Sequence, residues 1–349
     1  MKNVIRTSWR DAATLIVLSR KKPAIASRQG VNYDILFQTR TASASFANSV
    51  VFPGGVSEPV DASEDWLRLF KAFGFDQSHF EAFHRPGAPA TPIFQDNPVK
   101  RHISLRITAI RETFEELGLL LCCKQHQKDR SSPWACVLPI ADVKQWQQQI
   151  SKNPSELLNL CKEYQCYPDI WALHYWSNWL TPTHFPKRFD AAFFITALED
   201  KPECLDFNAE VAHVQWASPV STLERCRARS LVLFPPQSYE LSRLSVAADC
   251  EALLRFAAAR SARGHALHYP VIVHANDGQL HLLPGDDLYP SDVDYNNGAI
   301  KADETVLELR ERSKVLHRYE SFGSVKQFII KNFKSDHIDM GDRIIPVIA

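Results

Sequence analysis

Short apolar runs alternate with amphipathic segments along this chain, a pattern typical of a protein that mixes strands and helices. Residues 12–18 form a continuous apolar run, which is typical of a buried strand. Residues 33–38 follow the turn-forming Gly30 and Asn32 and are predicted to be a second strand. The other predicted strands are residues 50–52, 134–139, 191–198 and 211–216, with a hairpin of residues 269–274 and 279–283 around Asn276-Asp277-Gly278.

Helices are predicted where apolar residues recur at intervals of three and four. One such helix is expected around Trp66 and Phe73, and others are expected over residues 142–166, with a break at Asn153-Pro154, and 238–262. Residues 85–98 contain four prolines and are predicted to be loop or extended chain.

A further amphipathic helix is predicted over residues 104–117. Its apolar stripe consists of Ile107, Ile110, Phe114 and Leu117. Gly118 follows at the position where a glycine ends a helix in a left-handed turn.

Three carboxylates of this helix, Glu112, Glu115 and Glu116, fall at positions i, i+3 and i+4 and therefore share one face. Like charges this close repel each other unless a cation offsets them. Hard divalent cations such as Mg²⁺ take oxygen ligands and are usually held together with substrate phosphates. Arg111 is expected to neutralise one of the carboxylates. The cluster alone leaves two interpretations open, a metal site and an ordinary solvated acidic face.

Residues 50–55 read as a strand that runs into a glycine turn, where Gly54 and Gly55 let the backbone approach a ligand closely. Together with the acidic helix, this turn resembles the two halves of the Nudix box, G-x5-E-x7-R-E-U-x-E-E-x-G-U, in which U is a bulky aliphatic residue. The second half matches from Arg111 to Leu119 except at Thr113. Asp61 stands six residues after Gly55, where the family has Glu, and about 42 extra residues then precede Arg111.

An insert inside the box resembles the acyl-coenzyme A diphosphatase branch of the Nudix superfamily, the nucleoside diphosphate-linked moiety X motif 19 type. The resemblance covers about residues 9–320. Its other stretches include Trp9-Arg10, Asp65-Trp66-Leu67, the tryptophan-rich block 169–182, Arg188-Phe189-Asp190, Pro235-Pro236-Gln237, Tyr239-Glu240 and Leu282-Leu283-Pro284-Gly285-Asp286.

The resemblance implies an α+β fold, a Nudix α/β/α sandwich with a long insert inside the Nudix box and a C-terminal helix-plus-hairpin extension. We expect a Nudix domain at residues 9–235, with the insert at about 62–103, and an extension at residues 236–349 that packs on it.

The resemblance also implies metal-dependent hydrolysis of the diphosphate of coenzyme A or acyl-coenzyme A, with Mg²⁺ or Mn²⁺. Glu112 and Glu116 are then the direct metal ligands, Glu115 is a third ligand or one reached through water, and Arg111 orients Glu112. Glu210 is a candidate general base, although a surface carboxylate is the plainer interpretation.

Candidate substrate contacts follow from the chemistry of coenzyme A. Gly54 and Gly55 would approach the diphosphate, and the 3′-phosphate requires a cation such as Arg40, Lys187 or Arg188. An acyl chain needs an apolar groove, which Trp66 and the tryptophans of the block 169–182 could line. Such aromatic residues more often belong to the core, and His174 is expected to be a core histidine. The insert is hypothesised to be a lid or a wall that sets specificity.

Composition narrows the alternatives. Forty basic and forty acidic residues give a formal net charge of zero, which argues against a dedicated nucleic-acid binder and against mRNA decapping. The eight cysteines lack the paired spacing of a zinc site, which argues against the NADH pyrophosphatase branch, and they are expected to be reduced. A pyrophosphatase acting on NADH or ADP-ribose and a non-catalytic acyl-coenzyme A-binding module remain alternatives.

Cellular placement is the last expectation. No apolar run approaches the ~20 residues that span a bilayer, so no membrane partner is expected. We also expect an intracellular monomer that acts on a small molecule. The resemblance suggests the peroxisome. The terminal Val347-Ile348-Ala349 does not match a Ser-Lys-Leu signal, which leaves the mitochondrion and the cytosol as alternatives.

Overall fold

The computed structural model describes residues 9–21, 30–41, 49–130, 132–202, 211–295 and 299–346. Its largest element is an eight-stranded mixed sheet, whose strands run in the order β10-β7-β8-β1-β2-β3, with β4 paired to β1 and β9 paired to β2. The strands are β1 (Arg10–Arg20), β2 (Tyr33–Arg40), β3 (Val50–Val51), β4 (Gly54–Val56), β7 (His174–Leu180), β8 (Phe189–Leu198), β9 (Val211–Ala217) and β10 (Leu267–His268).

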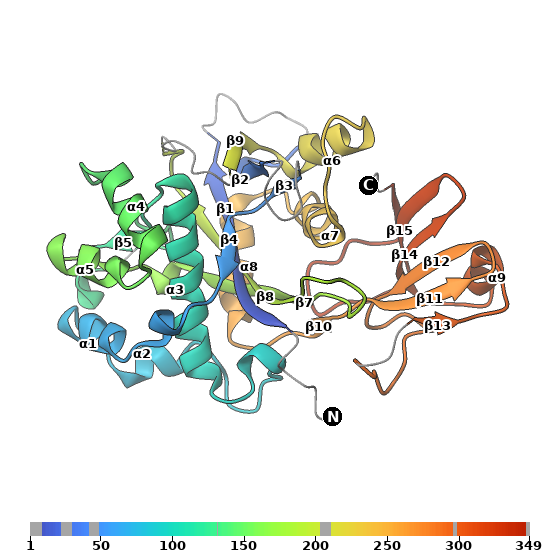
Figure 1. Cartoon of the computed structure of the whole chain (residues 1–349), viewed down its shortest axis with the longest axis horizontal. Helices are drawn as coiled ribbons and strands as arrows, with labels where there is room; N and C mark the ends of the chain where they lie inside the picture. Colours follow the sequence, from blue (N-terminus) through green and yellow to red (C-terminus); the bar gives the residue numbers. More distant parts are fainter. Residues whose placement is uncertain are drawn as a thin grey trace.

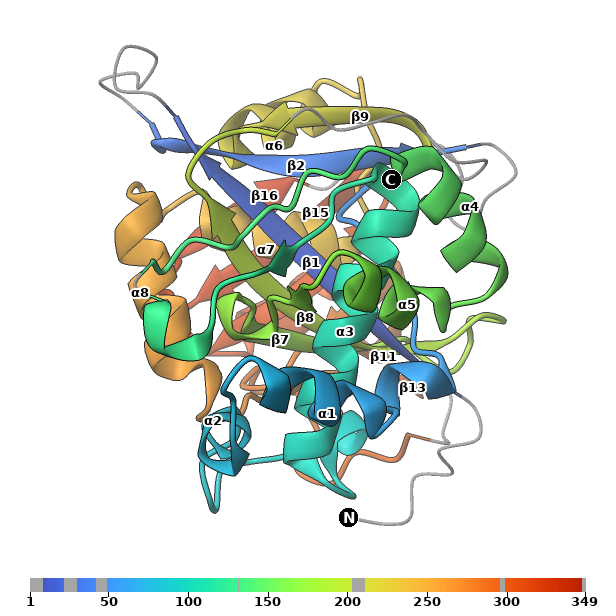
Figure 2. The ribbon, with the colours of Figure 1, turned by 90° about the vertical axis from the view of Figure 1, so that its left-hand side faces the viewer.

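Strand β1 organises the sheet because its two faces meet different helices. Ala13, Leu15 and Val17 belong to the apolar cluster that contains the buried face of helix α3 (Pro98–Leu117). Ile16 and Leu18 belong to a second cluster, on helices α7 (Pro235–Leu244) and α8 (Cys250–Ser261). Successive side chains of a strand point to opposite faces, so one apolar run supplies both cores. Figure 2 views the sheet from the side of α3.

The helices on the two faces complete the predicted α+β sandwich. Helices α4 (Val143–Lys152) and α5 (Glu156–Glu163) follow α3, and α6 (Pro219–Arg227) precedes α7. Strands β5 (Cys122–Cys123) and β6 (Tyr167–Pro168) pair as a small separate sheet near α5. The predicted break at Asn153-Pro154 is confirmed, since it separates α4 from α5.

The predicted insert is built into the core on the α3 side. It forms α1 (Asp65–Ala72), α2 (Gln77–Glu81) and, from Pro98, the first turns of α3, which is therefore longer than predicted. Trp66 and Phe70 are fully enclosed. Phe75 stacks on Trp171 with ring centroids 3.6 Å apart. The insert thus contributes core side chains, which does not fit a detachable lid.

A variant that lacks residues 64–98 is therefore expected to fail to fold. Losing a single buried Trp or Phe side chain costs about 3–5 kcal/mol, and a domain is stable by only about 5–15 kcal/mol. Circular dichroism and a thermal unfolding scan would measure the outcome. A variant that unfolds cooperatively and shows only a raised KM would restore the lid hypothesis.

A second sheet forms the C-terminal part of the chain and lies on the far side of the molecule from α3 (Figure 1). The predicted hairpin is confirmed within it, with Ala275 opposite Gly278. The remaining strands have no turn signal as strong as Asn276-Asp277-Gly278 and were not predicted. In sheet order its strands are β13 (Ile300–Lys301), β11 (Val271–Ala275), β12 (Gly278–Leu282), β14 (Leu316–Phe322), β15 (Val325–Lys331) and β16 (Arg343–Pro346), and α9 (Val306–Glu311) packs on β12 and β14.

Two predicted elements differ from the structure. The helix predicted over residues 238–262 is two helices, because Asp249 caps a new one by accepting a hydrogen bond from the amide of Ala252 at 2.7 Å. Residues 134–139 are not a strand. Their backbone contacts are single bonds, such as that from Ala135 to Ala197. Pro133 before the segment and Pro139 at its end cannot donate to a ladder.

Helices α7 and α8 lie on the main sheet, although they follow the predicted domain boundary near residue 235. The division into residues 9–235 and 236–349 stays a prediction. Among the described residues, no helix combines the length and the apolar character needed to cross a bilayer.

Candidate active site

Helix α3 presents the acidic residues from its C-terminal part. Asn97 caps its start by accepting a hydrogen bond from the amide of Lys100 at 3.0 Å, and Pro98 occupies the first turn, where its missing N–H costs nothing. The helix ends at Gly118, whose φ of 67° confirms the predicted left-handed glycine. Its C-terminal carbonyls, those of Phe114 and Glu115, accept hydrogen bonds from Gln147 of α4.

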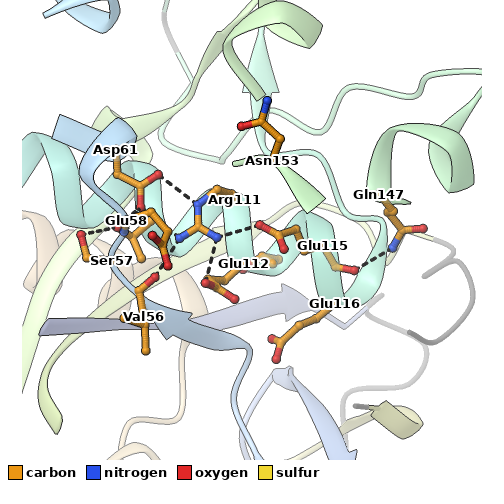
Figure 3. Close-up of polar contacts among 12 residues, drawn as sticks. Val56, Ser57, Glu58, Asp61, Arg111, Glu112, Glu115, Glu116, Gln147 and Asn153 are labelled. Carbon is orange, nitrogen blue, oxygen red and sulfur yellow. Dashed lines mark hydrogen bonds and ion pairs between the residues drawn. The ribbon is translucent and has the colours of Figure 1, made fainter. Parts of the chain in front are cut away.

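Arg111 is the hub of the site (Figure 3). Its Nη1 donates to Glu112 at 2.9 Å and to Glu115 at 2.7 Å. Its Nε and Nη2 each donate to a carboxylate oxygen of Asp61 at 3.0 Å, and Nη2 also reaches the carbonyl of Val56 at 2.8 Å. Burial alone lowers the pKa of Arg111, but the hydrogen bonds and charge of Asp61 and the two glutamates outweigh it and raise that pKa. The guanidinium therefore stays charged and fixes both glutamates.

Asp61, which stands where the Nudix box has a glutamate, contacts Arg111 despite the long insert between them. It lies in a 3₁₀ helix, Pro59–Ala62, directly before the insert, and only 1% of it is exposed. Besides Arg111, it accepts hydrogen bonds from Thr108 Oγ1 at 2.8 Å and from the amide of Glu58 at 3.0 Å. The insert therefore leaves the box intact in space, since its chain leaves after Asp61 and returns as the start of α3.

Glu116 faces the glycine turn. The amide of Gly54 donates to its Oε2 at 2.9 Å, and Arg40 Nη1 lies 3.8 Å from its Oε1. Burial, followed by the charge of Glu112, raises the pKa of Glu116 to about 8, against the opposing effects of Gly54, Gln38 and Arg40.

Glu112 lies against the second glycine of the turn. A β-carbon on Gly55 would lie 2.4 Å from its carboxylate, so only glycine permits this approach. Burial raises the pKa of Glu112 to about 7; Arg111 opposes this shift, and Glu115 and Asp61 add to it.

The donor set consists of the oxygen ligands that a divalent cation such as Mg²⁺ prefers. Asp61, Glu112, Glu115 and Glu116 bring four carboxylates together, while Arg111 and Arg40 supply two positive charges among the contacts described above. The surplus negative charge is partly buried, which is why the pKa values of the three glutamates are all raised. A cation bound by carboxylate oxygens of Glu112 and Glu116 would offset it.

These pKa values predict a pH-dependent metal affinity. The ordinary pKa of a glutamate is 4.5, and in the folded protein it is raised to about 7 in Glu112 and to about 8 in Glu116. Without metal, the folded state therefore holds more protons than the unfolded state between about pH 4.5 and pH 8. Its stability is then expected to fall as the pH rises from 4.5 toward 8, and metal binding must expel the protons.

The rise in melting temperature that Mn²⁺ or Mg²⁺ produces should therefore be larger at about pH 8.5 than at about pH 6. Differential scanning fluorimetry would measure it, with Glu116→Gln as the control. Equal shifts at both pH values would contradict a site made of these carboxylates.

Comparison with known proteins decides the family. A family model described as the NUDT19 Nudix domain matches residues 9–244, and one described as the NUDT19 C-terminal domain matches residues 272–330. The chain belongs to this Nudix family. Its similarity to a solved Nudix hydrolase from Alicyclobacillus acidocaldarius supports the fold, with a TM-score of 0.53 and 24% identity over 71% of this chain and 96% of that one.

Relatives of this NUDT19 family member extend along nearly its whole length. A Xenopus laevis protein named acyl-coenzyme A diphosphatase NUDT19 is 34% identical and covers 91% of both chains. Proteins of the same name from Gallus gallus and Homo sapiens are 35% and 33% identical, over 89% and 91% of this chain and 88% and 87% of their own. The predicted resemblance, Nudix fold and hydrolase class are therefore confirmed.

The other predicted site residues of this Nudix hydrolase do not all lie at the carboxylate cluster. Glu210 lies outside the described residues. Arg40 lies beside Glu116, within the carboxylate cluster. Arg188 donates to the carbonyl of Thr183 at 3.2 Å and lies over the ring of Trp9, and Lys187 is exposed beside it. Their role with a 3′-phosphate stays a prediction.

Trp176 and Trp179 of the tryptophan-rich block belong to the core, whereas Trp171 is partly exposed. Trp176 and Trp179 donate their indole N–H groups to Glu240 of α7 at 2.8 and 2.9 Å. Glu240 also accepts from Ser177 at 2.7 Å and from Arg243 at 3.0 Å. The motifs at residues 169–182 and 239–240 thus form one buried polar network that attaches α7 to β7.

His174, predicted to be a core histidine, begins β7 and is partly exposed. Burial, reinforced by the nearby charge of Arg106, lowers its pKa to about 4.

Sequence reasoning missed the residues that support the acidic cluster from a distance. No sequence motif marks three of these residues, Gln147, Thr108 and Gln38. Gln147 caps the carbonyl of Glu115, which lies 32 residues away in the sequence. Glu58 could have been found from the sequence, because it lies three residues before Asp61, the spacing of the capping box that the structure shows.

Proposed function

We propose that this protein hydrolyses the diphosphate of coenzyme A and acyl-coenzyme A, with Mg²⁺ or Mn²⁺. The products are adenosine 3′,5′-bisphosphate and 4′-phosphopantetheine or its acylated form. The observation that carries the proposal is the Arg111-centred carboxylate cluster, preserved in a chain that resembles acyl-coenzyme A diphosphatases over about nine-tenths of its length.

Each part of the cluster suits this reaction. Glu112 and Glu116 would hold the metal, with Glu115 as a further ligand or one reached through water. A divalent cation there would neutralise phosphate oxygens and make a bound water more acidic. Arg111 fixes the side chains of Glu112 and Glu115, so little reorganisation is needed on binding.

The glycine turn and Arg40 would receive the diphosphate. Gly55 carries no side chain between the backbone of β4 and the carboxylate of Glu112, and the amide of Gly54 donates to Glu116, so an anion held by metal can lie close to that backbone. Arg40 adds positive charge on the β2 side of Glu116.

The test is a substrate panel with the purified full chain. Coenzyme A, acyl-coenzyme A esters of several chain lengths, NADH and ADP-ribose are incubated with Mg²⁺ or Mn²⁺, and products are separated by chromatography. Glu116→Gln removes one ligand, and Glu163→Gln, on the exposed side of α5, is the matched control.

Release of adenosine 3′,5′-bisphosphate from the coenzyme A substrates, lost in Glu116→Gln and kept in Glu163→Gln, is the expected result. Turnover confined to NADH or ADP-ribose would overturn the substrate. Binding of coenzyme A without any turnover would overturn the enzymatic proposal in favour of a binding module.

A further inference from the structure

Two cysteines outside the acidic site lie within reach of each other. Sγ of Cys123, in β5, is 2.9 Å from Sγ of Cys136, and both thiols are free. An S–S bond measures about 2.05 Å, so the sulfur atoms need to approach by only roughly 1 Å to join.

Contacts with β6 and with the residue that follows it fix this proximity. Cys123 is paired with Tyr167 in the β5–β6 ladder. The amide of Cys136 donates to Oδ2 of Asp169 at 2.9 Å, and Asp169 is itself held by Arg130 at 2.7 Å. Both cysteines are thus attached to residues two positions apart in the chain, which holds their backbones close together.

Cys123 resembles a reactive thiol, and Cys136 resembles the resolving thiol beside it. The hydrogen bond from Cys136, helped by the amide of Gln125 and by Tyr167, lowers the pKa of Cys123 to about 6 against the effect of burial. The shared proton raises the pKa of Cys136, which is the more exposed of the two. Cys123 itself is buried, with 3% of it exposed, and its partner Cys136 is partly exposed. Thiolate character and an adjacent, partly exposed thiol together favour oxidation.

Three further cysteines lie near this pair and form an enclosed group. Cys122, Cys161 and Cys166 lie together with their sulfur atoms within 4.8 Å of one another, and all three are buried. Burial raises the pKa of Cys122 and Cys161, which keeps those thiols protonated, whereas their hydrogen bonds lower the pKa of Cys166 to about 4. Every thiol of this group is buried, while Cys123 contacts the partly exposed Cys136. Because successive side chains of β5 point to opposite faces, Cys122 faces this enclosed group while Cys123 faces Cys136.

We propose that Cys123 and Cys136 are a redox modification site that hydrogen peroxide converts to a reversible disulfide. The Cys123 thiolate attacks one peroxide oxygen, the O–O bond breaks, and the sulfenic acid of Cys123 forms while hydroxide leaves and takes up a proton to become water. Sγ of Cys136 then attacks Sγ of Cys123, the S–O bond breaks, and a second water leaves. Two thiols lose two protons and two electrons, and peroxide is reduced to two waters.

The bond would close the chain between residues 123 and 136, directly before α4. Helix α4 carries Gln147, which caps the C-terminal carbonyls of the acidic helix. Oxidation would therefore fix the segment that leads to this cap, and it should raise thermal stability, because a closed loop restricts the unfolded chain.

The experiment uses the full chain in a Cys204→Ser background, since Cys204 lies outside the described residues. Protein is treated with hydrogen peroxide, free thiols are blocked by alkylation, and peptides are mapped by mass spectrometry with and without dithiothreitol. The expected result is a peptide that links Cys123 to Cys136, disappears on reduction, and is accompanied by a melting temperature higher by a few degrees.

Cys136→Ser should lose both the linked peptide and the shift, whereas Cys226→Ser, a buried thiol in α6, should keep both. Alkylation of Cys123 and Cys136 at full yield after peroxide treatment would overturn the proposal, as would a disulfide that joins other cysteines instead. Mapping of the parent protein needs no substitution at either position, so the result stands even if Cys136→Ser does not fold.

Discussion

Replacing Glu240 with alanine is expected to lower the free energy of unfolding by about 3–5 kcal/mol, because it leaves the Arg243 guanidinium buried without its carboxylate. Arg243 is 1% exposed, and Glu240 is fully enclosed. The indole N–H groups of Trp176 and Trp179 would also lose their acceptor. Urea unfolding followed by tryptophan fluorescence would measure the change.

Two variants separate the charge from the hydrogen bonds. Glu240→Gln keeps one acceptor oxygen but removes the charge, so its loss should be smaller than that of alanine. The double change of Glu240 and Arg243 to leucine removes both charges and should recover part of the stability, because no buried ion is left alone. A loss below about 1 kcal/mol in Glu240→Ala would show that water or another group replaces the carboxylate.

Activity of the folded fraction should be unchanged in these variants, because none of the contacts described for Glu240 reaches the carboxylates of α3. The measurement is the turnover rate per folded molecule at a temperature well below the unfolding transition. A lower rate in fully folded Glu240→Gln would instead assign the network a part in catalysis.

Replacing Asp61 with alanine is expected to lower metal affinity or activity by roughly 10–100-fold, the usual effect of losing a group that orients metal ligands. Asp61 holds two of the three guanidinium nitrogens of Arg111, and the third holds Glu112 and Glu115. Without Asp61, the guanidinium keeps only the carbonyl of Val56 as a partner on that side, and both glutamates are oriented less firmly. Titration with Mn²⁺ and steady-state kinetics would measure the two effects.

The matched variant is Asp61→Glu, which restores the residue that the Nudix box has at this position. It keeps the charge but adds one methylene in a buried place, so it should retain more activity than alanine while losing some stability. Asp65→Ala, on the partly exposed start of α1, controls for removal of an acidic side chain nearby. Unchanged metal affinity in Asp61→Ala would show that Glu112 and Glu115 alone suffice to hold Arg111.

The sequence predicted those parts of the protein whose signal is local. The strand at residues 12–18 was readable because a sheet buried on both faces needs an unbroken apolar run. The acidic helix was readable because a helix repeats every 3.6 residues, so spacing alone places Glu112, Glu115 and Glu116 on one face. The hairpin at residues 271–282 was readable because Asn276-Asp277-Gly278 suits its tight turn.

Elements that depend on distant partners were predicted less well. In the sequence, the insert interrupts the Nudix box. Its two halves meet in the fold through the contact of Asp61 with Arg111, 50 positions away. The two helices at residues 235–261 share one apolar periodicity, and their separation depends on the cap at Asp249 and on Asn32 of a remote turn.

The sequence by itself determined the family, the position of the acidic helix and the residue types that a divalent cation requires, because these follow from short-range spacing. Only the tertiary structure decided that Asp61 holds Arg111, that the insert belongs to the core, and that Trp176 and Trp179 donate to Glu240. The physical reason is that a buried charge or aromatic ring is defined by what surrounds it, and those surroundings come from segments far apart in the chain.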